Sequence, residues 1–207
     1  MIEGQRRQRL DRQQIVAAAL ELLDEVGLDR LTTRALAQRL GVQQPALYWH
    51  FKNRDELLAS MAEKMLTEEL PAQPEVGSDP SVWLAERARA FRRALLAHRD
   101  GARVHAGSTP ALAQLPMLEA QISVMMDAGL SAREALQTGM VISRYTIGWV
   151  LEEQASILRL PAPDDIQNDA PALSSALQSF DQGDSNANFE YGLAAVIDGL
   201  LRASARK

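Results

Sequence analysis

The sequence predicts an all-α protein, and three observations support this prediction. Apolar residues recur at helical spacing over most of the 207-residue chain, whereas the alternation typical of β-strands does not occur. Glycine, proline and capping residues stand at the ends of these periodic segments. Charge is divided unevenly, because residues 1–54 hold nine Lys or Arg against six Asp or Glu although the chain carries a net charge of -5. A basic head on an acidic body predicts a DNA-binding module joined to a different kind of domain.

The composition argues against several classes of protein. The chain has no cysteine, which excludes disulfide bonds and any cysteine-based metal or nucleophile site. No apolar run approaches the roughly 18 residues that a membrane span requires. The N-terminal residues also lack the apolar core of a signal peptide. We therefore expect a cytoplasmic protein with no membrane partner.

The head is expected to contain three helices. Residues 15–26 repeat apolar side chains at helical spacing, and Gly27 supplies a stop signal for this first helix. Thr32 or Thr33 is a suitable N-cap for a second helix, which Gly41 ends. A short third helix after Gly41 would complete a helix-turn-helix.

The stretch GVQQPALYWH, which begins at Gly41, is expected to hold the recognition helix. Pro45 suits the first helical turn, where its missing N–H needs no partner. Gln44 is suited to a bidentate hydrogen bond with adenine in the major groove, and the methyl group of Ala46 to contact with the methyl group of thymine. The aromatic and basic side chains that follow can contact phosphates. The alternative interpretation is that these aromatic residues only pack a turn.

The body after residue 55 is expected to be helical throughout. Apolar periodicity predicts helices near residues 54–70, 81–98, 111–128, 131–158, 172–180 and 187–203. The proline-rich residues 71–80 are expected to form a connector, and residues 161–171 a mobile loop. Two apolar faces, over residues 145–151 and 189–201, exceed what such a body needs to bury, so we expect them to form an isologous four-helix interface.

The N-terminal motif TTRALAQRLGVQQPALYWHFKNRDELL resembles that of the TetR family of bacterial transcriptional regulators. The body resembles the tetracycline-repressor branch of that family through FRRALLAHRDGARVHAGSTP and IGWVLEEQ. The resemblance implies a helix-turn-helix DNA-binding domain over residues 1–55 and a helical ligand-binding and dimerisation domain over residues 56–207. It implies a homodimeric repressor of a palindromic operator, released by a small molecule. The operator contacts that it implies are Thr32, Thr33, Arg34, Gln44, Pro45, Ala46, Tyr48, Trp49, His50 and Lys52.

The resemblance also implies a ligand site, since tetracycline repressors bind their drug as a Mg²⁺ chelate. It assigns metal binding to His105 and, through water and from the partner subunit, to Glu152. No cofactor is obligatory on this interpretation, and Mg²⁺ is expected only with a chelating effector. The ligand-contacting residues that the resemblance implies are Leu70, Arg87, Phe91, His105, Ser108, Thr109, Pro110, Gln121, Arg144 and Glu152.

Several of these residues depart from the pattern of the tetracycline repressors: Ser108 replaces a threonine, Thr109 an arginine and Arg144 a pocket histidine. Leu70 and Arg87 stand where that branch has a histidine and an asparagine that anchor the drug. We therefore predict an effector other than tetracycline, or much weaker binding of tetracycline. The guanidinium groups of Arg87 and Arg144 suit an anionic ligand, although pairing with acids of the body would explain them equally well.

Two further functions remain open at this point. A DNA-binding regulator without a small-molecule effector would need the same head. A helical enzyme would use His105, Glu152 and Glu153 as acid-base groups. The chain has neither a Ser-His-Asp arrangement nor a paired-carboxylate signature, so we predict a regulator and not an enzyme.

Overall fold

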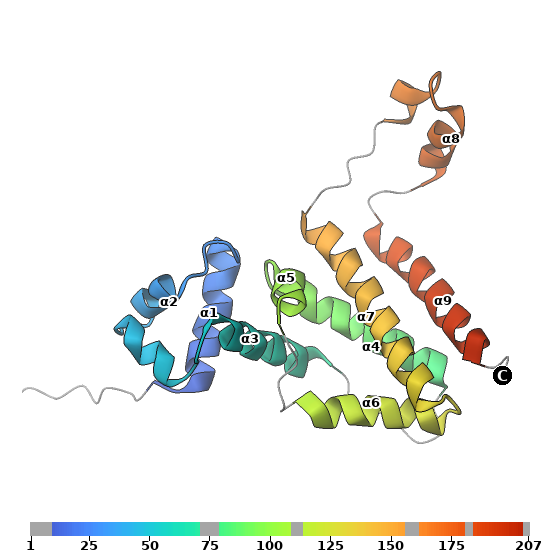
Figure 1. Ribbon diagram of the computed structural model, residues 1–207. Helices are drawn as coiled ribbons and strands as arrows, with labels where there is room; N and C mark the ends of the chain where they lie inside the picture. Colours follow the sequence, from blue (N-terminus) through green and yellow to red (C-terminus); the bar gives the residue numbers. More distant parts are fainter. Residues whose placement is uncertain (1–9, 71–78, 109–113, 156–161, 181–183, 205–207) are drawn as a thin grey trace, which may run out of the picture. The chain divides into compact units, whose positions relative to one another are not determined.

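The computed structural model (Figure 1) describes residues 10–70, 79–108, 114–155, 162–180 and 184–204. All regular elements in these ranges are helical, so the predicted all-α fold is confirmed. None of these helices combines the length and the apolar character that a membrane crossing needs. The chain divides into two units, one made of Met1–Ala72 and Ala90–Gln121, the other of Gln73–Arg89 and Ile122–Lys207.

The first unit contains the predicted head and part of the body. Its elements are α1 (Arg12–Val26), α2 (Thr33–Arg39), the 3-10 helix η1 (Gln44–Trp49), α3 (Arg54–Glu69), α5 (Gly101–Ala106), the end of α4 (Pro80–Leu96) and the start of α6 (Leu115–Asp127). Only glycine fits at the start of α5, because a β-carbon at Gly101 would clash with the carbonyl oxygen of Leu95.

Capping residues set the ends of the first helices where the sequence predicted them. Asp11 and Gln14 form a capping box: the Asp11 carboxylate accepts from the Gln14 backbone N–H at 2.7 Å, and the Gln14 side chain accepts from the Asp11 backbone N–H at 3.1 Å. Helix α1 ends at Gly27, whose φ of 78° favours glycine. The side chains of Thr32 and Asn53 cap α2 and α3. Thr32, and not Thr33, is therefore the cap of the second helix.

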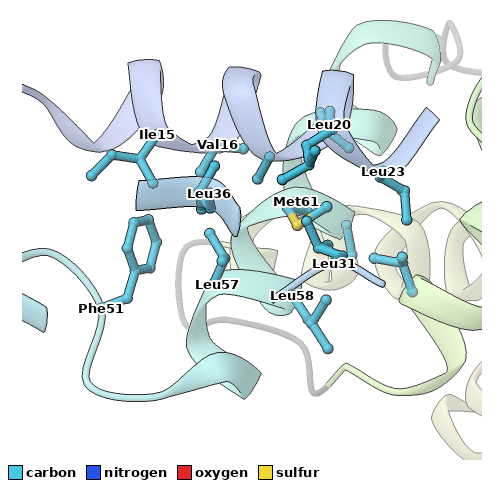
Figure 2. Close-up of a cluster of buried hydrophobic side chains, with 14 of the residues drawn as sticks. Ile15, Val16, Leu20, Leu23, Leu31, Leu36, Phe51, Leu57, Leu58 and Met61 are labelled. Carbon is cyan, nitrogen blue, oxygen red and sulfur yellow. The ribbon is translucent and has the colours of Figure 1, made fainter. Parts of the chain in front are cut away.

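Helices α1, α2 and α3 share one hydrophobic core, and their side chains point toward one another (Figure 2). Ile15, Leu36 and Met61 are fully buried in it. Burial of each such side chain contributes about 1.5 to 3 kcal/mol relative to exposure. Leu47, within η1, and Phe51, two residues after its end, are buried in the same core. This anchoring fixes η1 on the head while leaving its other side chains at the surface.

The second unit is built on α7 (Ala132–Ala155) and α9 (Ser185–Ser204), which pack against each other. Helix α8 (Pro171–Ser179) packs on a 3-10 turn, η3 (Pro163–Ile166), and the Ser174 hydroxyl donates to the Pro163 carbonyl oxygen at 2.8 Å. The segment expected to be a mobile loop therefore contains a helical turn and the first residue of α8.

The apolar face of α9 is buried within the chain itself. Phe189, Leu193 and Ile197 are 0%, 1% and 4% exposed and belong to the core of the second unit. These three side chains therefore belong to the core of the unit, while the four-helix interface over residues 145–151 and 189–201 stays a prediction. Tyr191 on α9, 83% exposed, and Val141 on α7 are apolar side chains that remain accessible.

Candidate nucleic-acid interface and ligand-contacting residues

The predicted recognition segment exposes large aromatic side chains. Trp49 is 89% exposed and Tyr48 51% exposed, whereas Leu47, which precedes them in the same segment, is buried. Pro45 lies in the first turn, as predicted, and the segment is a 3-10 helix in which the His50 backbone N–H donates to the Leu47 carbonyl oxygen at 3.0 Å. An isolated 3-10 run of this length is uncommon, so the packing of its buried residue stabilises it. The alternative of aromatic residues that merely pack a turn does not fit this exposure.

The side chain of Gln44 is oriented by two neighbours. Its Nε2 donates to Thr33 Oγ1 at 2.8 Å and lies 3.5 Å from Tyr48 Oη. Both hydrogens of Nε2 are directed at these two hydroxyl oxygens, so Oε1 remains as a free acceptor. Oε1 can accept from the N6 donor of adenine, and the hydrogen of the long contact to Tyr48 can be redirected to the N7 acceptor. Thr33 therefore orients the amide before any base is bound.

A hollow of about 420 Å³ opens beside these side chains. Its lining includes Asp29, Leu31, Thr32, Thr33, Tyr48, Lys52, Asn53 and Arg54, a mixture of hydroxyl, amide and basic groups that suits phosphate. Asn53 and Arg54 were not among the predicted contacts, although the run KNR was a visible signal. Asp29 opposes phosphate binding, but Arg103 binds it at 2.7 Å and lowers the pKa of its carboxyl group.

Arg12 connects the end of the recognition segment to α3. Its Nη1 donates to the His50 carbonyl oxygen at 2.6 Å and to Glu56 at 2.9 Å, and its Nη2 donates to the Ser60 hydroxyl at 2.8 Å. The guanidinium also lies 4.3 Å from the centroid of the Phe51 ring. Arg12 is therefore a positioning residue for the recognition segment. The sequence alone gave no signal of this role, because the partners lie at least 38 residues away.

Glu56 holds the backbone that follows the recognition segment. It accepts from the Lys52 backbone N–H at 2.8 Å, and this bond, followed by the Arg12 side chain, lowers the pKa of the Glu56 carboxyl group. The side chains of Lys52 and Arg34 are both exposed. Two of the predicted operator contacts thus present basic groups to solvent on a fixed backbone.

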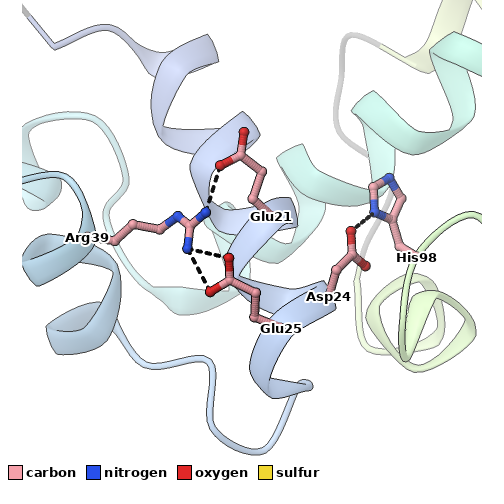
Figure 3. Close-up of polar contacts among 5 residues, drawn as sticks. All are labelled: Glu21, Asp24, Glu25, Arg39 and His98. Atoms are coloured by element: carbon pink, nitrogen blue, oxygen red, sulfur yellow. Dashed lines mark hydrogen bonds and ion pairs between the residues drawn. The ribbon is translucent and has the colours of Figure 1, made fainter.

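Ion pairs also connect α1 to its neighbours (Figure 3). Arg39 of α2 bonds both carboxylate oxygens of Glu25 at 2.8 Å and one of Glu21 at 2.9 Å. Asp24 bonds the Nδ1 of His98 at 2.9 Å. Exposed pairs of this kind contribute about 0.2 to 1 kcal/mol each, so they orient α2, and the segment between α4 and α5 that holds His98, on α1 more than they stabilise the unit.

The residues predicted to contact a ligand belong to both units. In the first unit the structure describes Leu70, Phe91, His105, Ser108 and Gln121; in the second it describes Arg87, Arg144 and Glu152. Thr109 and Pro110 lie outside the described residues. Arg144 and Glu152 are both exposed on α7.

His105 and Gln121 each carry a polar atom that is free to bind a ligand. The His105 ring packs edge-on against Phe91 with 5.0 Å between centroids, and burial lowers the pKa of its imidazole, which is therefore neutral at pH 7. His105 Nδ1 and Gln121 Nε2 are the buried side-chain nitrogen or oxygen atoms without a hydrogen-bond partner in the part of the chain that is described. Because buried polar atoms are normally bonded, both mark places where a ligand atom would be stabilised.

Arg87 and Arg89, two residues apart on α4, have opposite surroundings. Arg89 forms a bidentate pair with Glu190, with N–O distances of 2.8 and 2.7 Å. Arg87 has no hydrogen bond or ion pair among the described residues, and its guanidinium lies 5.8 Å from the centroid of the Trp83 ring. Burial lowers the pKa of Arg87 to about 10, a value at which the group is still charged at neutral pH.

Two family descriptions match the chain. "Bacterial regulatory proteins, tetR family" matches residues 15–61, and "Tetracyclin repressor-like, C-terminal domain" matches residues 73–203. The chain belongs to the TetR family. Since this is a family of regulatory proteins, the prediction that the chain is not an enzyme is confirmed.

Relatives in the TetR family are similar over nearly the whole chain. The class A tetracycline repressor from transposon 1721 of Escherichia coli is 47% identical over 192 residues, which are 91% of this chain and 89% of the repressor. A TetR variant from Acinetobacter baumannii AYE, solved with minocycline, is 42% identical with a TM-score of 0.78, and the match covers 94% of this chain and 95% of that one. Class A TetR with 5a,6-anhydrotetracycline and magnesium is 41% identical with a TM-score of 0.73, and the match covers 93% of this chain and 99% of that one.

The residues of this TetR-family chain fit a magnesium ion only in part. A neutral His105 Nδ1 can serve as a metal ligand, and Ser108 lies close by, its hydroxyl donating to the His105 carbonyl oxygen at 2.9 Å. No group of three or more His, Cys, Asp or Glu side chains suited to a metal ion occurs within the described ranges. Because Mg²⁺ requires octahedral coordination, a ligand and water would have to supply most of it.

Proposed function

We propose that this chain is a ligand-responsive transcriptional repressor that acts in the cytoplasm. It binds a palindromic operator as a homodimer and releases it when a small molecule binds the body. The observation that carries the proposal is the surface of η1, where Tyr48 and Trp49 are exposed beside a half-buried Gln44 and over a buried Leu47. Membership of the TetR family and the relatedness to tetracycline repressors support it.

The predicted operator residues divide into base-reading and phosphate-binding groups. We expect Gln44 and Ala46 to read an adenine and a thymine in the major groove, with further base contacts from Pro45, Trp49 and Arg34. Hydroxyl, imidazole and ammonium groups hold the backbone; they belong to Thr32, Thr33, Tyr48, His50 and Lys52. Two such heads in a homodimer read the two halves of a palindrome.

Paired substitutions test this division. Gln44→Ala removes a bidentate base contact and should relax the preference at one base pair by about 1 to 3 kcal/mol. Lys52→Ala removes a phosphate contact and should weaken binding to all sequences alike, lowering the salt slope by about one unit. Fluorescence anisotropy with operator variants over a salt series measures both effects. An equal loss of sequence preference in the two variants would refute the assignment.

The domain boundary is proposed to lie within α3. Residues 1–55 then form the DNA-binding domain and residues 56–207 the ligand-binding and dimerisation domain. This division leaves α3 to serve both, since its buried face completes the core of the head. The mechanism of release follows by linkage, because an effector that prefers a non-operator arrangement of the two heads must lower operator affinity by the same factor.

The effector is proposed to contact the residues that the resemblance assigned: Leu70, Arg87, Phe91, His105, Ser108, Thr109, Pro110, Gln121, Arg144 and Glu152. The unbonded nitrogens of His105 and Gln121 support this assignment. If the effector chelates Mg²⁺, His105 would bind the ion directly and Glu152 through water, and the ion would polarise the bound oxygen atoms of the effector.

Tetracycline is proposed to be a poor effector. Leu70 offers no hydrogen bond to a polar drug group, and leaving such a group unpaired costs about 1 to 3 kcal/mol. With Arg87 replacing a second anchor, we expect binding weaker by roughly two orders of magnitude. Titration of tetracycline and Mg²⁺ into the protein-operator complex measures this, and release of DNA at nanomolar drug would contradict it.

A further inference from the structure

We propose that the effector of this protein is an organic anion with an aromatic body, and that Arg87 binds its carboxylate. The proposal deepens the function proposed above and rests on it, because it names the chemical class of the small molecule. The structural feature behind it is the Arg87 guanidinium, which has no hydrogen bond or ion pair within the described ranges.

Arg87 is unlike the other arginines that the structure places beside acids. Arg12, Arg39, Arg89 and Arg103 each form at least one ion pair of 2.9 Å or shorter with a carboxylate. For Arg87 no carboxylate or carbonyl partner occurs within the described residues. Desolvation is the one cause of its lowered pKa, so no neighbouring charge compensates the partly buried guanidinium. A charge in such a place is expensive unless something pairs with it.

The spacing along α4 shows why this helix itself supplies no ion-pair partner for Arg87. The positions that face Arg87 at three and four residues hold apolar side chains: Trp83, Leu84, Ala90 and Phe91. An acid at any of them would form an intrahelical pair. Arg89, by contrast, reaches Glu190 on α9. Arg89 therefore has a carboxylate partner, whereas the guanidinium of Arg87 is left to bind a ligand.

The surroundings favour a carboxylate over a phosphate. The buried Trp83 ring lies on one side of the Arg87 guanidinium, and the N–H groups of the planar fork remain free for a bidentate contact. A planar carboxylate carries one negative charge, which a single guanidinium neutralises. A phosphate carries more charge and would require further cations. The aromatic ring of Trp83 also provides an apolar neighbour for a ring on the ligand.

Matched pairs of probes test the proposal directly. Benzoate, 2-naphthoate and anthracene-2-carboxylate are each compared with the primary amide of the same ring system, which has the same shape but no charge. Isothermal titration calorimetry measures binding to the full-length wild-type protein, to Arg87→Asn and to Arg89→Asn. Because a charge-assisted bidentate contact is worth about tenfold or more in affinity, we expect at least one acid to bind the wild type about tenfold more tightly than its amide.

The variants separate the role of Arg87 from a general effect of charge. Arg89→Asn should keep the preference for the acid, whereas Arg87→Asn should bind acid and amide within about twofold of each other. Arg87→Gln serves as a second variant if circular dichroism shows that Arg87→Asn is unfolded. The proposal is overturned if no acid binds the wild type more tightly than its amide, or if the preference survives in both Arg87 variants. Operator binding without any probe is measured in parallel, and its absence would refute the proposed function and not the anion alone.

Discussion

Key polar side chains of the DNA-reading head are bonded to their neighbours, whereas several of those assigned to the effector are not. In the head, Gln44 is held by Thr33, and Arg12 is held by three oxygen atoms. Among the residues assigned to the effector, His105 Nδ1 and Gln121 Nε2 are buried without a partner, and Arg87 has no ion pair among the described residues.

This difference indicates two ways of building a binding site. A surface whose side chains are already fixed loses little conformational freedom on binding, and so recognises DNA as a rigid template. A site with unsatisfied polar groups is less stable by itself and gains most from a ligand that completes its hydrogen bonds. A ligand-responsive repressor needs both, since one site has to read a fixed operator and the other has to respond.

The largest expected effect comes from breaking the bonds of the head. Arg12→Met keeps the length of the side chain but removes three hydrogen bonds, so the free energy of unfolding should fall by about 2 kcal/mol. Arg34→Met, at an exposed position nearby, should stay within about 0.5 kcal/mol of wild type. Urea denaturation followed by circular dichroism measures both. Equal stability of the two variants would show that the Arg12 contacts do not fix the head.

Where a buried polar group has no hydrogen-bond partner, we expect its removal to raise the free energy of unfolding. Gln121→Met removes a buried unsatisfied amide without changing the volume much, and should raise the free energy of unfolding by about 1 kcal/mol. Gln14→Met, which breaks the capping box of α1, should lower it by about 0.5 to 1 kcal/mol. If both substitutions destabilise the protein equally, the Gln121 amide has a hydrogen-bond partner in solution. That outcome would contradict the proposed difference between the head and the effector site.

A smaller effect is expected when the orientation of a base-reading side chain is lost. Thr33→Val keeps the shape of the residue but removes the acceptor for Gln44 Nε2, so the preference for adenine at one position should fall by about 1 kcal/mol. The salt slope should not change, because no charge is lost. Thr33→Ser retains the oxygen and should behave like wild type. Unchanged discrimination by Thr33→Val in anisotropy titrations would remove Thr33 from the reading mechanism.

The smallest effect concerns the acid stability of the head. The Lys52 backbone N–H and the Arg12 side chain lower the pKa of Glu56 in the folded state. The stability that Glu56 contributes is therefore fully present above its unfolded pKa of about 4.3 and is lost as the pH falls through the lower folded value. Glu56→Gln should flatten the dependence of the melting temperature on pH between about 5 and 3. Asp55→Asn, one residue away, is the control; a wild-type slope in Glu56→Gln would contradict the assignment.

Local signals in the sequence predicted most of the helices but few of the contacts between them. Gly27 and Thr32 marked helix ends correctly because capping depends on residues within one turn. Pro45 marked the first turn of the recognition segment, but not that this segment is a 3-10 helix, since that depends on how Leu47 packs in the core.

Long-range contacts could not be predicted in this way. Nothing in the sequence marked Arg12 as a positioning residue, whereas in the structure it bonds residues 38 to 48 positions away. Leu193 and Ile197 looked like partner-facing residues because periodicity identifies an apolar face without saying what covers it. The contrast between Arg87 and Arg89 likewise depends on Glu190, about a hundred residues along the chain.

This last contrast also provides the most direct test of the central claim, that the head is complete by itself while the effector site is completed by its ligand. The measurement is the free energy of unfolding of ligand-free, refolded Arg87→Met and Arg89→Met at equal protein concentration. Loss of the exposed Arg89 pair should lower it by about 0.5 to 1 kcal/mol, while loss of the unpaired Arg87 charge should leave it unchanged or raise it. Destabilisation of Arg87→Met as large as that of Arg89→Met would contradict the claim.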